Sequence, residues 1–351
     1  MTRITRRRFK LAAISASAVF ATAPALAQDT AVQLYGTIDL AVGQLEQQPP
    51  GPPNAAITRV RGVHNGGVTT SFFGIRGVED LGGGLKAKFQ LESWLRADTG
   101  ASARFNPPGP PQDPFWSRSA WVAVEGGFGE VMLGTFINPT FLASAFTGAM
   151  NFNSIFSPGV RQQYAGGTRG YADVDTRLHN AVQYTTPRLG GATAALAVQA
   201  GEGSGTGPNY FGNVVYRSGP LLLALGVSKV EHQPPPDPAS ALDQELIVLG
   251  GSYDLNVVKL FAQYTNFENQ QANLKVRTPQ FGLTAPIGLG ELQLAWGRSE
   301  FSGSSTDTRT TTSMIYFYNL SRRTGLYGGV AADKVNVGTA ESYLLGVRHM
   351  F

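Results

Sequence analysis

Alternation of apolar and polar residues is the feature that most constrains the fold of this chain. In "LKAKFQLESWLR", residues 85–96, most apolar side chains occupy one parity and the charged side chains occupy the other. The same period of two recurs in "VQLYGTIDLAVG" near the N-terminus and in "ESYLLGVRHMF" at the C-terminus. Because successive side chains of a β-strand point to opposite faces, each stretch predicts a strand with one apolar and one polar face. Soluble sheets alternate in the same way, so the pattern alone leaves a soluble secreted β-protein open.

The first 27 residues have the pattern of a secretory signal peptide. A basic region comes first and contains Arg3, Arg6, Arg7, Arg8 and Lys10. An apolar stretch follows it, and the segment ends in Ala25-Leu26-Ala27, which has the small residues of a cleavage site. We therefore expect residues 1–27 to be cleaved on export and residues 28–351 to form the mature domain. The segment "TRRRFK" also resembles a twin-arginine export signal, which is the alternative to the general secretory route.

The composition argues against several classes of function. Loss of the signal would leave 28 − 5 = 23 Lys and Arg against 24 Asp and Glu, a net charge of −1. That balance lacks the basic excess of a nucleic-acid-binding protein, so we expect no nucleic-acid partner. The chain has no cysteine, which excludes disulfides and cysteine metal ligands. Its four histidines lack the spacing of a metal site, so we expect no metal and no cofactor.

The apolar residues are distributed along the chain and do not form one long block. After the signal, no window approaches the ~18 apolar residues of a membrane helix, although the whole chain is 42% hydrophobic. Short Gly- or Asn-marked turns alternate with longer polar or proline-rich connections such as "QQPPGPPNAA" and "EHQPPPDPAS". The short turns are "EDLGGGLKA", "EGGFGEVM", "TPRLGGATA", "YRSGPLLL", "YDLNVVKL", "PIGLGELQ" and "SRRTGLYG". This rhythm is typical of an up-and-down transmembrane β-barrel, and strands on both sides of each turn plus one at each end predict sixteen antiparallel strands.

A barrel in a membrane must also close on itself. Every backbone N–H and C=O needs a partner within hydrocarbon, so the last strand is expected to pair with the first. The polar face of each strand then lines the interior, and the apolar face contacts lipid. We expect the lipid-facing band of the last strand to contain Tyr343, Leu345, Val347 and Phe351.

Several segments of the chain resemble the sixteen-stranded trimeric general porins of Gram-negative outer membranes. "VQLYGTIDLAVG" resembles the first strand of that family, "SFFGIRGVEDLGGGLKAKFQLE" its second hairpin and "FGEVMLG" its next periplasmic turn. "HNAVQYTTPRLGG", "YNLSRRTGLYGGVAAD" and the terminal "VRHMF" are similar to later family segments in the same order, over residues 31–351. The resemblance implies an outer-membrane homotrimer in contact with lipid and lipopolysaccharide. It also implies that the closing Phe351 and its alternating neighbours are read by the barrel-assembly machinery.

The resemblance further implies that one external loop folds inward and narrows the lumen. The corresponding segment runs from about Ile137 to Thr176 and carries an apolar run of phenylalanines that we expect to pack against the barrel wall. Family constrictions usually oppose acidic loop residues to a basic wall. This chain departs from the pattern, because no Asp or Glu occurs between Gly134 and Ala172.

Lumen-facing parity and the loop select the candidate pore residues. The wall candidates are Arg76, Lys86, Lys88, Glu92, Arg96, Arg118 and Arg177, and the loop adds Arg161, Arg169 and Asp173. Arg118 and Arg177 match basic wall positions of the family, whereas Phe72 and Thr135 stand where the family often has arginine. Rings of Arg and Lys are what anion pores use, so we predict anion preference.

The function predicted from these features is a passive, water-filled channel for small hydrophilic solutes. A substrate-specific porin, with a binding site at the constriction of the same barrel, is the alternative. A barrel enzyme would need a Ser-His pair near the rim, and no motif in the sequence supports one.

Overall fold

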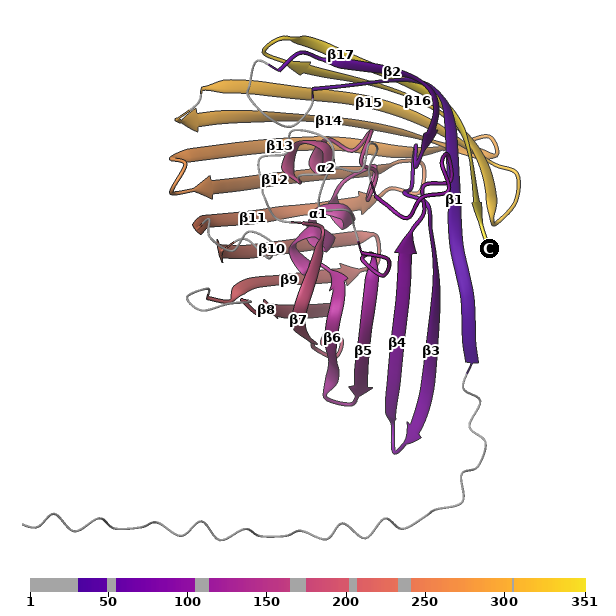
Figure 1. Cartoon of the computed structure of the whole chain (residues 1–351), viewed down its shortest axis with the longest axis vertical. Coiled ribbons are helices and arrows are strands. Elements are labelled where there is room, and N and C mark those ends of the chain that lie inside the picture. Colours follow the sequence, from indigo (N-terminus) through magenta and orange to yellow (C-terminus); the bar gives the residue numbers. More distant parts are fainter. Residues whose placement is uncertain are drawn as a thin grey trace, which may run out of the picture.

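The chain is almost entirely β-sheet. The computed structural model describes residues 31–48, 55–104, 114–164, 175–201, 207–232, 241–304 and 306–351, so the expected signal peptide lies outside the described residues. The strands, shown in Figure 1, are β1 (Ala31–Gln47), β2 (Thr58–Asn65), β3 (Phe72–Gly82), β4 (Leu85–Trp94), β5 (Ser119–Gly126), β6 (Gly129–Ile137), β7 (Arg177–Thr185), β8 (Ala192–Gln199), β9 (Asn209–Ser218), β10 (Leu221–His232), β11 (Ala241–Asp254), β12 (Lys259–Asn269), β13 (Leu274–Ile287), β14 (Gly290–Gly303), β15 (Asp307–Asn319), β16 (Thr324–Val335) and β17 (Gly338–Met350). None of the helices in these residues has the length and apolar character needed to cross a membrane.

The last strand closes the sheet against the first, as predicted. β17 pairs antiparallel with β1, from Met350 opposite Thr37 to Tyr343 opposite Gln44. Beyond the end of β17, the Phe351 N–H donates to the Gly36 carbonyl at 3.1 Å, and the Gly36 N–H donates to the Phe351 carbonyl at 3.2 Å. The C-terminal residue is therefore part of the hydrogen-bonded wall.

Seventeen strand segments make a sixteen-stranded barrel because β2 and β3 share one position in the wall. Residues 40–47 of β1 pair with β2, and residues 31–37 of β1 pair with β3, so the count is 17 − 1 = 16. The break between them, residues 66–71, is held by Asp39. Its carboxylate accepts the N–H of Val68 at 3.1 Å and of Thr69 at 2.7 Å. The strand count predicted from the turns is confirmed, but the broken second strand was not foreseen.

All seven predicted short turns connect consecutive strands, from β3–β4 to β15–β16. The β3–β4 turn shows why its sequence is glycine-rich. Gly82, Gly83 and Gly84 have φ of 81°, 63° and 81°, a left-handed conformation that residues with a Cβ adopt only at a cost. Because the strands run up and down in chain order, these turns lie at one end of the barrel.

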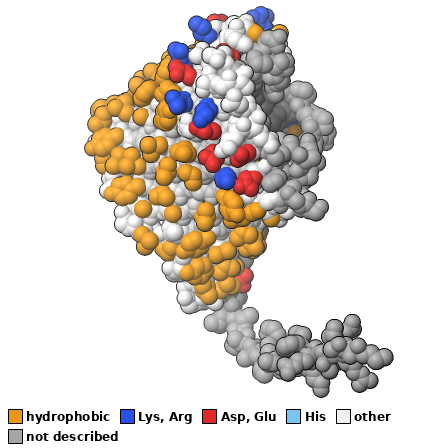
Figure 2. Space-filling model, turned by 90° about the vertical axis from the view of Figure 1, so that its left-hand side faces the viewer, with side chains coloured by type: hydrophobic (Ala, Val, Ile, Leu, Met, Phe, Trp, Pro, Cys, Tyr) orange, Lys and Arg blue, Asp and Glu red, His pale blue; other side chains and the backbone are white. Residues whose placement is uncertain are grey.

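The two faces of the strands differ as the alternation predicts. On β1, the outward Val32, Leu34 and Val42 are exposed, whereas the inward Thr37 and Asp39 are buried. On β17, the exposed outward residues are Tyr343, Leu345 and Val347, and Phe351 follows them. Figure 2 shows hydrophobic side chains gathered into a broad area on one face of the molecule. Such a surface is stable in lipid, which explains why so much apolar area is exposed.

The described part of the inserted loop, residues 138–164, folds into the barrel as expected. It contains α1 (Pro139–Thr147) and α2 (Pro158–Gln163), which lie within the ring of strands in Figure 1. α1 packs on β8 to β12, and α2 packs on β14 and β15. Phe141 and Phe156 are buried against this wall, whereas Phe152 is exposed. The loop therefore covers one side of the lumen and leaves the β4–β7 side open.

Candidate functional site

The inserted loop faces the end of β4 and the start of β7 across an open space. A cavity of about 160 Å³ lies between them, which we call the constriction cavity. From the loop it is lined by apolar and aromatic residues, including Phe141, Phe152 and Tyr164. On the opposite side it is lined by Thr69, Thr70, Trp94, Arg104, Arg118 and Arg177.

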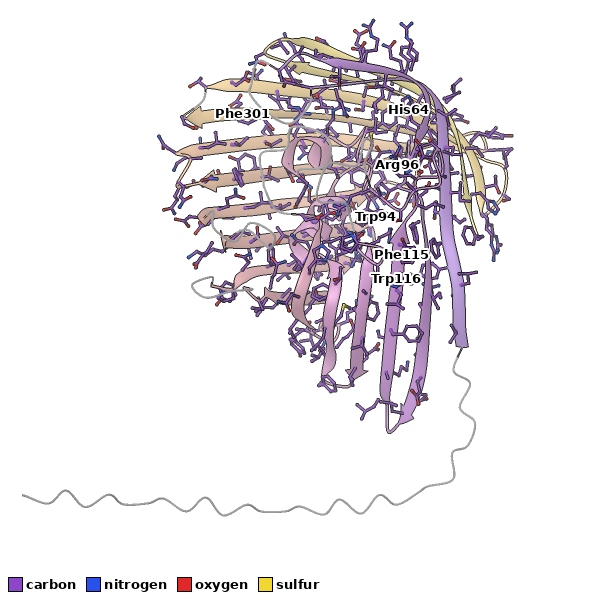
Figure 3. All side chains as sticks on the ribbon, in the orientation of Figure 1. His64, Trp94, Arg96, Phe115, Trp116 and Phe301 are labelled. Atoms are coloured by element: carbon purple, nitrogen blue, oxygen red, sulfur yellow. The ribbon has the colours of Figure 1, made fainter. Side chains whose placement is uncertain are left out.

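Three arginines surround the indole ring of Trp94, the last residue of β4. The guanidinium carbons of Arg104, Arg118 and Arg177 lie 5.2, 5.0 and 5.3 Å from the ring centre. Figure 3 labels Trp94 near the middle of the molecule, next to the inserted loop. The face of an aromatic ring attracts cations, so Trp94 helps to hold three like charges close together.

Arg118 is fixed by a carboxylate on the neighbouring strand. Its guanidinium forms an ion pair with Glu92 of β4, which also accepts a hydrogen bond from the Tyr35 hydroxyl at 2.6 Å. The guanidinium carbon lies 3.6 Å from the ring centre of Phe72. The Phe72 position, where the resemblance implies arginine, therefore supports a neighbouring arginine with its ring.

Asp175 fixes the second arginine, Arg104. Arg104 contacts both carboxylate oxygens of Asp175, with Nη2 to Oδ2 at 2.8 Å. Burial alone would raise the pKa of Asp175, but the charge and hydrogen bonds of Arg104 outweigh it and lower the pKa to about 2. Asp175 is therefore a charged anchor for Arg104.

The third arginine, Arg177, is held by backbone carbonyls. Its Nε donates to the Arg118 carbonyl at 2.7 Å, and its Nη1 donates to the Thr176 carbonyl at 3.1 Å. The cluster thus holds three guanidinium groups against two carboxylates, a local charge of 3 − 2 = +1. The arginines line the cavity, whereas Glu92 and Asp175 do not. A solute in the constriction cavity therefore meets the cations directly.

One predicted pore residue has a different position. The prediction that Arg161 lines the constriction is wrong, because its side chain is 1% exposed. Its Nε donates to Asp333 Oδ2 at 3.0 Å, and its two Nη atoms donate to the carbonyls of Ile155 and Glu46 at 2.9 and 3.0 Å. Arg161 instead fastens α2 to the barrel wall.

Arg96 also lies away from the constriction cavity. It forms an ion pair with Asp98 at 3.2 Å and is not among the residues that line the constriction cavity. Strand alternation ends at Trp94, and the chain there turns into the connection before β5. The alternation of inward and outward side chains along β4 therefore does not predict the direction of the Arg96 side chain.

The other predicted residues lie toward the short-turn end or outside the described chain. Arg76 is exposed, donates to Gln33 at 2.8 Å and lies over the ring of Tyr35. Lys86 is exposed near the β3–β4 turn, and Lys88 forms ion pairs with Glu125 and Glu130. Arg169 and Asp173 lie outside the described residues.

Sequence reasoning missed Arg104, the role of Trp94, and the Thr69–Thr70 edge of the cavity. Arg104 lies in the connection before β5, where no periodicity indicates which way a side chain points. Trp94 could have been suspected, because it breaks an otherwise charged parity in β4. The threonines enter the cavity only because Asp39 folds the break between β2 and β3 inward.

Comparison with known proteins identifies the family. A model of the Gram-negative porin family matches residues 12–338. The chain belongs to the Gram-negative porins. This porin is 31% identical to outer membrane porin protein 32 of Delftia acidovorans, over 96% of its own length and 98% of that protein. It is 27% identical to an outer membrane porin protein of Bordetella pertussis, over 92% and 95% of the two chains.

Solved structures agree with the fold of the porin. The anion-selective porin from Comamonas acidovorans is 28% identical and superposes with a TM-score of 0.74, covering 92% of this chain and 100% of that chain. A trimer form of OmpT from Vibrio cholerae shares the fold alone, at 12% identity and a TM-score of 0.63, covering 92% and 99% of the two chains. The porin is therefore an outer-membrane barrel that forms a passive channel.

Proposed function

We propose that this porin is an anion-preferring diffusion channel for small hydrophilic solutes. The observation that carries the proposal is that Arg104, Arg118 and Arg177 line the constriction cavity while Glu92 and Asp175 do not. The inserted loop supplies no acidic residue to oppose them between Gly134 and Ala172. The similar anion-selective porin from Comamonas acidovorans gives independent support.

Selection between anions and cations would arise from the electric field of the three arginines. A low-dielectric wall strengthens the attraction of an anion to fixed positive charges and the repulsion of a cation. The guanidinium groups stay protonated throughout the working pH range, so this preference needs no titrating group. Solutes then move down their concentration gradients, and the narrow cavity limits their size.

The test is the reversal potential of the porin in a planar lipid bilayer under a KCl gradient. We expect the sign of chloride preference, and we expect the preference to weaken with salt as the Debye length falls from about 30 Å at 0.01 M to about 3 Å at 1 M. A reversal potential of the opposite sign would overturn the proposal.

A carboxylate-binding site at the constriction is the second candidate function. The indole Nε1 of Trp94 and the Nε of Arg118 are buried donors with no hydrogen-bond acceptor among the described residues. A carboxylate at the edge of the Trp94 ring could accept hydrogen bonds from such donors. Concentration-dependent block of the chloride current by benzoate, and none by a neutral analogue such as benzamide, would support a specific porin over a general one.

We further propose that the porin is a homotrimer in contact with outer-membrane lipid and lipopolysaccharide. The side chains of β2 from Thr58 to Val63 are exposed on both faces of the strand, including Val60 and Val63 at 55% and 58%. Another subunit would cover the outward side chains of this segment. Substitution of both valines with aspartate should reduce the detergent-extracted mass from three chains to one, and an unchanged trimer would remove this contact.

Two proposals concern export and assembly. Residues 1–27 would be removed, which the mass of the extracted protein tests directly. Tyr343, Leu345, Val347 and Phe351 would form the signal read by the barrel-assembly machinery. The variant Phe351→Ser should accumulate unfolded in the periplasm, whereas Leu320→Ser, an exposed apolar change in a turn, should assemble normally.

A further inference from the structure

The break between β2 and β3, residues 66–71, forms one edge of the constriction cavity. Thr69 and Thr70 in this break line the cavity together with residues of the inserted loop. The pairing of β2 with β1 ends at Asn65, and the pairing of β3 with β1 begins at Phe72. Other contacts must therefore hold the break in place, and whatever fixes it also fixes this edge of the cavity.

Asp39 of β1 holds the backbone of the break along its whole length. The Gly66 N–H donates to the Asp39 carbonyl at 2.8 Å, and the Asp39 N–H donates to the Ser71 hydroxyl at 2.9 Å. Between these two ends, the N–H groups of Val68 and Thr69 donate to Oδ2 of the Asp39 carboxylate. The direction of that carboxylate therefore decides where Thr69 lies.

Tyr327 orients the carboxylate from another strand. It belongs to β16, and its hydroxyl donates to Oδ1 of Asp39 at 2.5 Å across the place where the barrel closes, between residues 288 apart in the chain. Tyr327 thus takes one carboxylate oxygen, while the break takes the other. The ring of Tyr327 is 3% exposed and stacks on Phe317 with the ring centres 6.0 Å apart. The hydroxyl is therefore presented from a fixed part of the wall.

Two glycines make room for this tyrosine. A Cβ on Gly346, which lies opposite Tyr327 in β17, would be 2.2 Å from the tyrosine ring. A Cβ on Gly67 of the break would be 2.0 Å from the Tyr327 hydroxyl. The close approach of the break to Tyr327 therefore requires glycine at both positions.

The break also contacts the inserted loop. The Asn153 side chain donates to the Gly67 carbonyl at 3.2 Å. Its Oδ1 accepts the N–H groups of Ile155 and Phe156 at 2.8 and 2.7 Å. The break and the loop are thus joined next to the cavity that both of them line.

We propose that Tyr327 and Asp39 form a clasp that fixes Thr69 and Thr70 as a second size-determining edge of the pore, in addition to the inserted loop. Tyr327 and Asp39 are not among the residues that line the constriction cavity, so they are positioning residues. Thr70 is the residue of this edge that we assign to direct contact with solutes. The clasp would set the width of the passage and the three arginines its charge. The inference rests on the proposed role of the constriction cavity as the passage for solutes.

The test is the swelling of liposomes that contain the porin in uncharged solutes of increasing size, from glycerol through arabinose to sucrose. Swelling rates report the size limit of the pore independently of its ion preference. Tyr327→Phe removes only the hydroxyl of the clasp, and Thr70→Trp enlarges the edge itself. Tyr316→Phe is the matched control, because the Tyr316 hydroxyl donates to the Ile287 carbonyl at 2.9 Å near a short turn. Heat-dependent gel migration verifies that each variant is folded.

We expect Tyr327→Phe to raise the ratio of the arabinose rate to the glycerol rate at least roughly threefold, since one hydrogen bond to a carboxylate changes the population of a fixed conformation by more than that factor. Tyr316→Phe should leave the ratio unchanged, and Thr70→Trp should lower it. An unchanged or lower ratio for Tyr327→Phe would overturn the proposal, as would an unchanged ratio for Thr70→Trp.

The reversal potential in a KCl gradient separates this proposal from the proposed anion preference. Its sign should stay the same in all three variants, because none of them changes an arginine. Cation preference of the wild-type porin would overturn the proposed selectivity, and the swelling rates of uncharged solutes would still decide whether the clasp sets the size limit.

Discussion

Two clusters of arginines and carboxylates in the barrel have different roles. In the constriction cavity, Arg104 and Arg118 are paired with carboxylates and Arg177 is held by backbone carbonyls, but all three arginines line the space. Across the barrel, Arg161 and Arg309 converge on Asp333, which is completely buried. Asp333 also accepts from the Thr311 hydroxyl at 2.7 Å. We call Arg161, Arg309 and Asp333 the loop tether.

The difference lies in what covers each cluster. α2 lies over the loop tether and excludes water, so its charges act on the position of the loop. The side chain of Gln162 extends the attachment, donating to the Thr311 hydroxyl at 2.7 Å and to the Gly297 carbonyl at 3.2 Å. The arginines of the constriction cavity border an unfilled space, so their charge acts on solutes that enter it. A fixed loop and a basic wall thus lie on opposite sides of this cavity.

Breaking the loop tether should have the largest effect. Asp333→Asn leaves two buried arginines without a full counter-charge, and loss of one partner in a buried ion pair costs about 3–5 kcal/mol. We expect a lower heat-denaturation temperature of the folded form and larger, noisier single-channel conductance as the loop moves. Glu231→Gln, at an exposed ion pair, should change neither quantity. Identical stability of both variants would show that the tether does not hold the loop.

Removing charge from the constriction cavity should change ion selectivity. Arg118→Ser deletes one cation and leaves Glu92 without its partner, so the anion-to-cation permeability ratio should fall by roughly fivefold, or about 1 kcal/mol. Arg76→Ser, at the short-turn end of the lumen, should have a smaller effect. Reversal potentials of the two variants in the same KCl gradient provide the measurement. A larger change in the reversal potential for Arg76→Ser would show that ion selectivity is not determined at the constriction cavity.

Removing the aromatic support should have a moderate effect. Trp94→Leu keeps all three arginines but removes the ring on which they converge, an interaction worth about 0.5–1 kcal/mol at each site. We expect benzoate block of the chloride current to weaken severalfold with little change in the sign of the reversal potential. Phe115→Leu, an exposed aromatic outside the cavity lining, is the control. Equal benzoate block of the chloride current in both variants would show that Trp94 does not contribute to the binding site.

Acidification should have the smallest effect within the usual range. The pKa of Asp175 is lowered to about 2 from an ordinary value of 3.8, so its stabilising pair with Arg104 is fully present above pH 3.8 and is lost as pH falls through about 2. The reversal potential of Asp175→Asn should therefore differ from that of wild type at pH 7 and at pH 4. The two should converge only near pH 2. Convergence already at pH 4 would show that Arg104 does not hold Asp175 in its charged form.

The amino-acid sequence by itself determined the barrel. Alternation places one face of each strand in lipid, and the turn residues permit only short connections at one end, so strand number and closure follow from local rules. The positions of Arg118 and Arg177 could also be predicted, because alternation along a strand determines which face of the sheet a side chain occupies.

Only the tertiary structure decided which charges reach the solute. Arg161 and Arg104 both lie in connections without periodicity, yet one is sealed beneath α2 and the other lines the cavity. That outcome depends on contacts with Asp333 and Asp175, which are 172 and 71 residues away along the chain. Parity is a local property of a strand, whereas the exposure of a charge depends on everything that packs over it, and no local pattern encodes that packing.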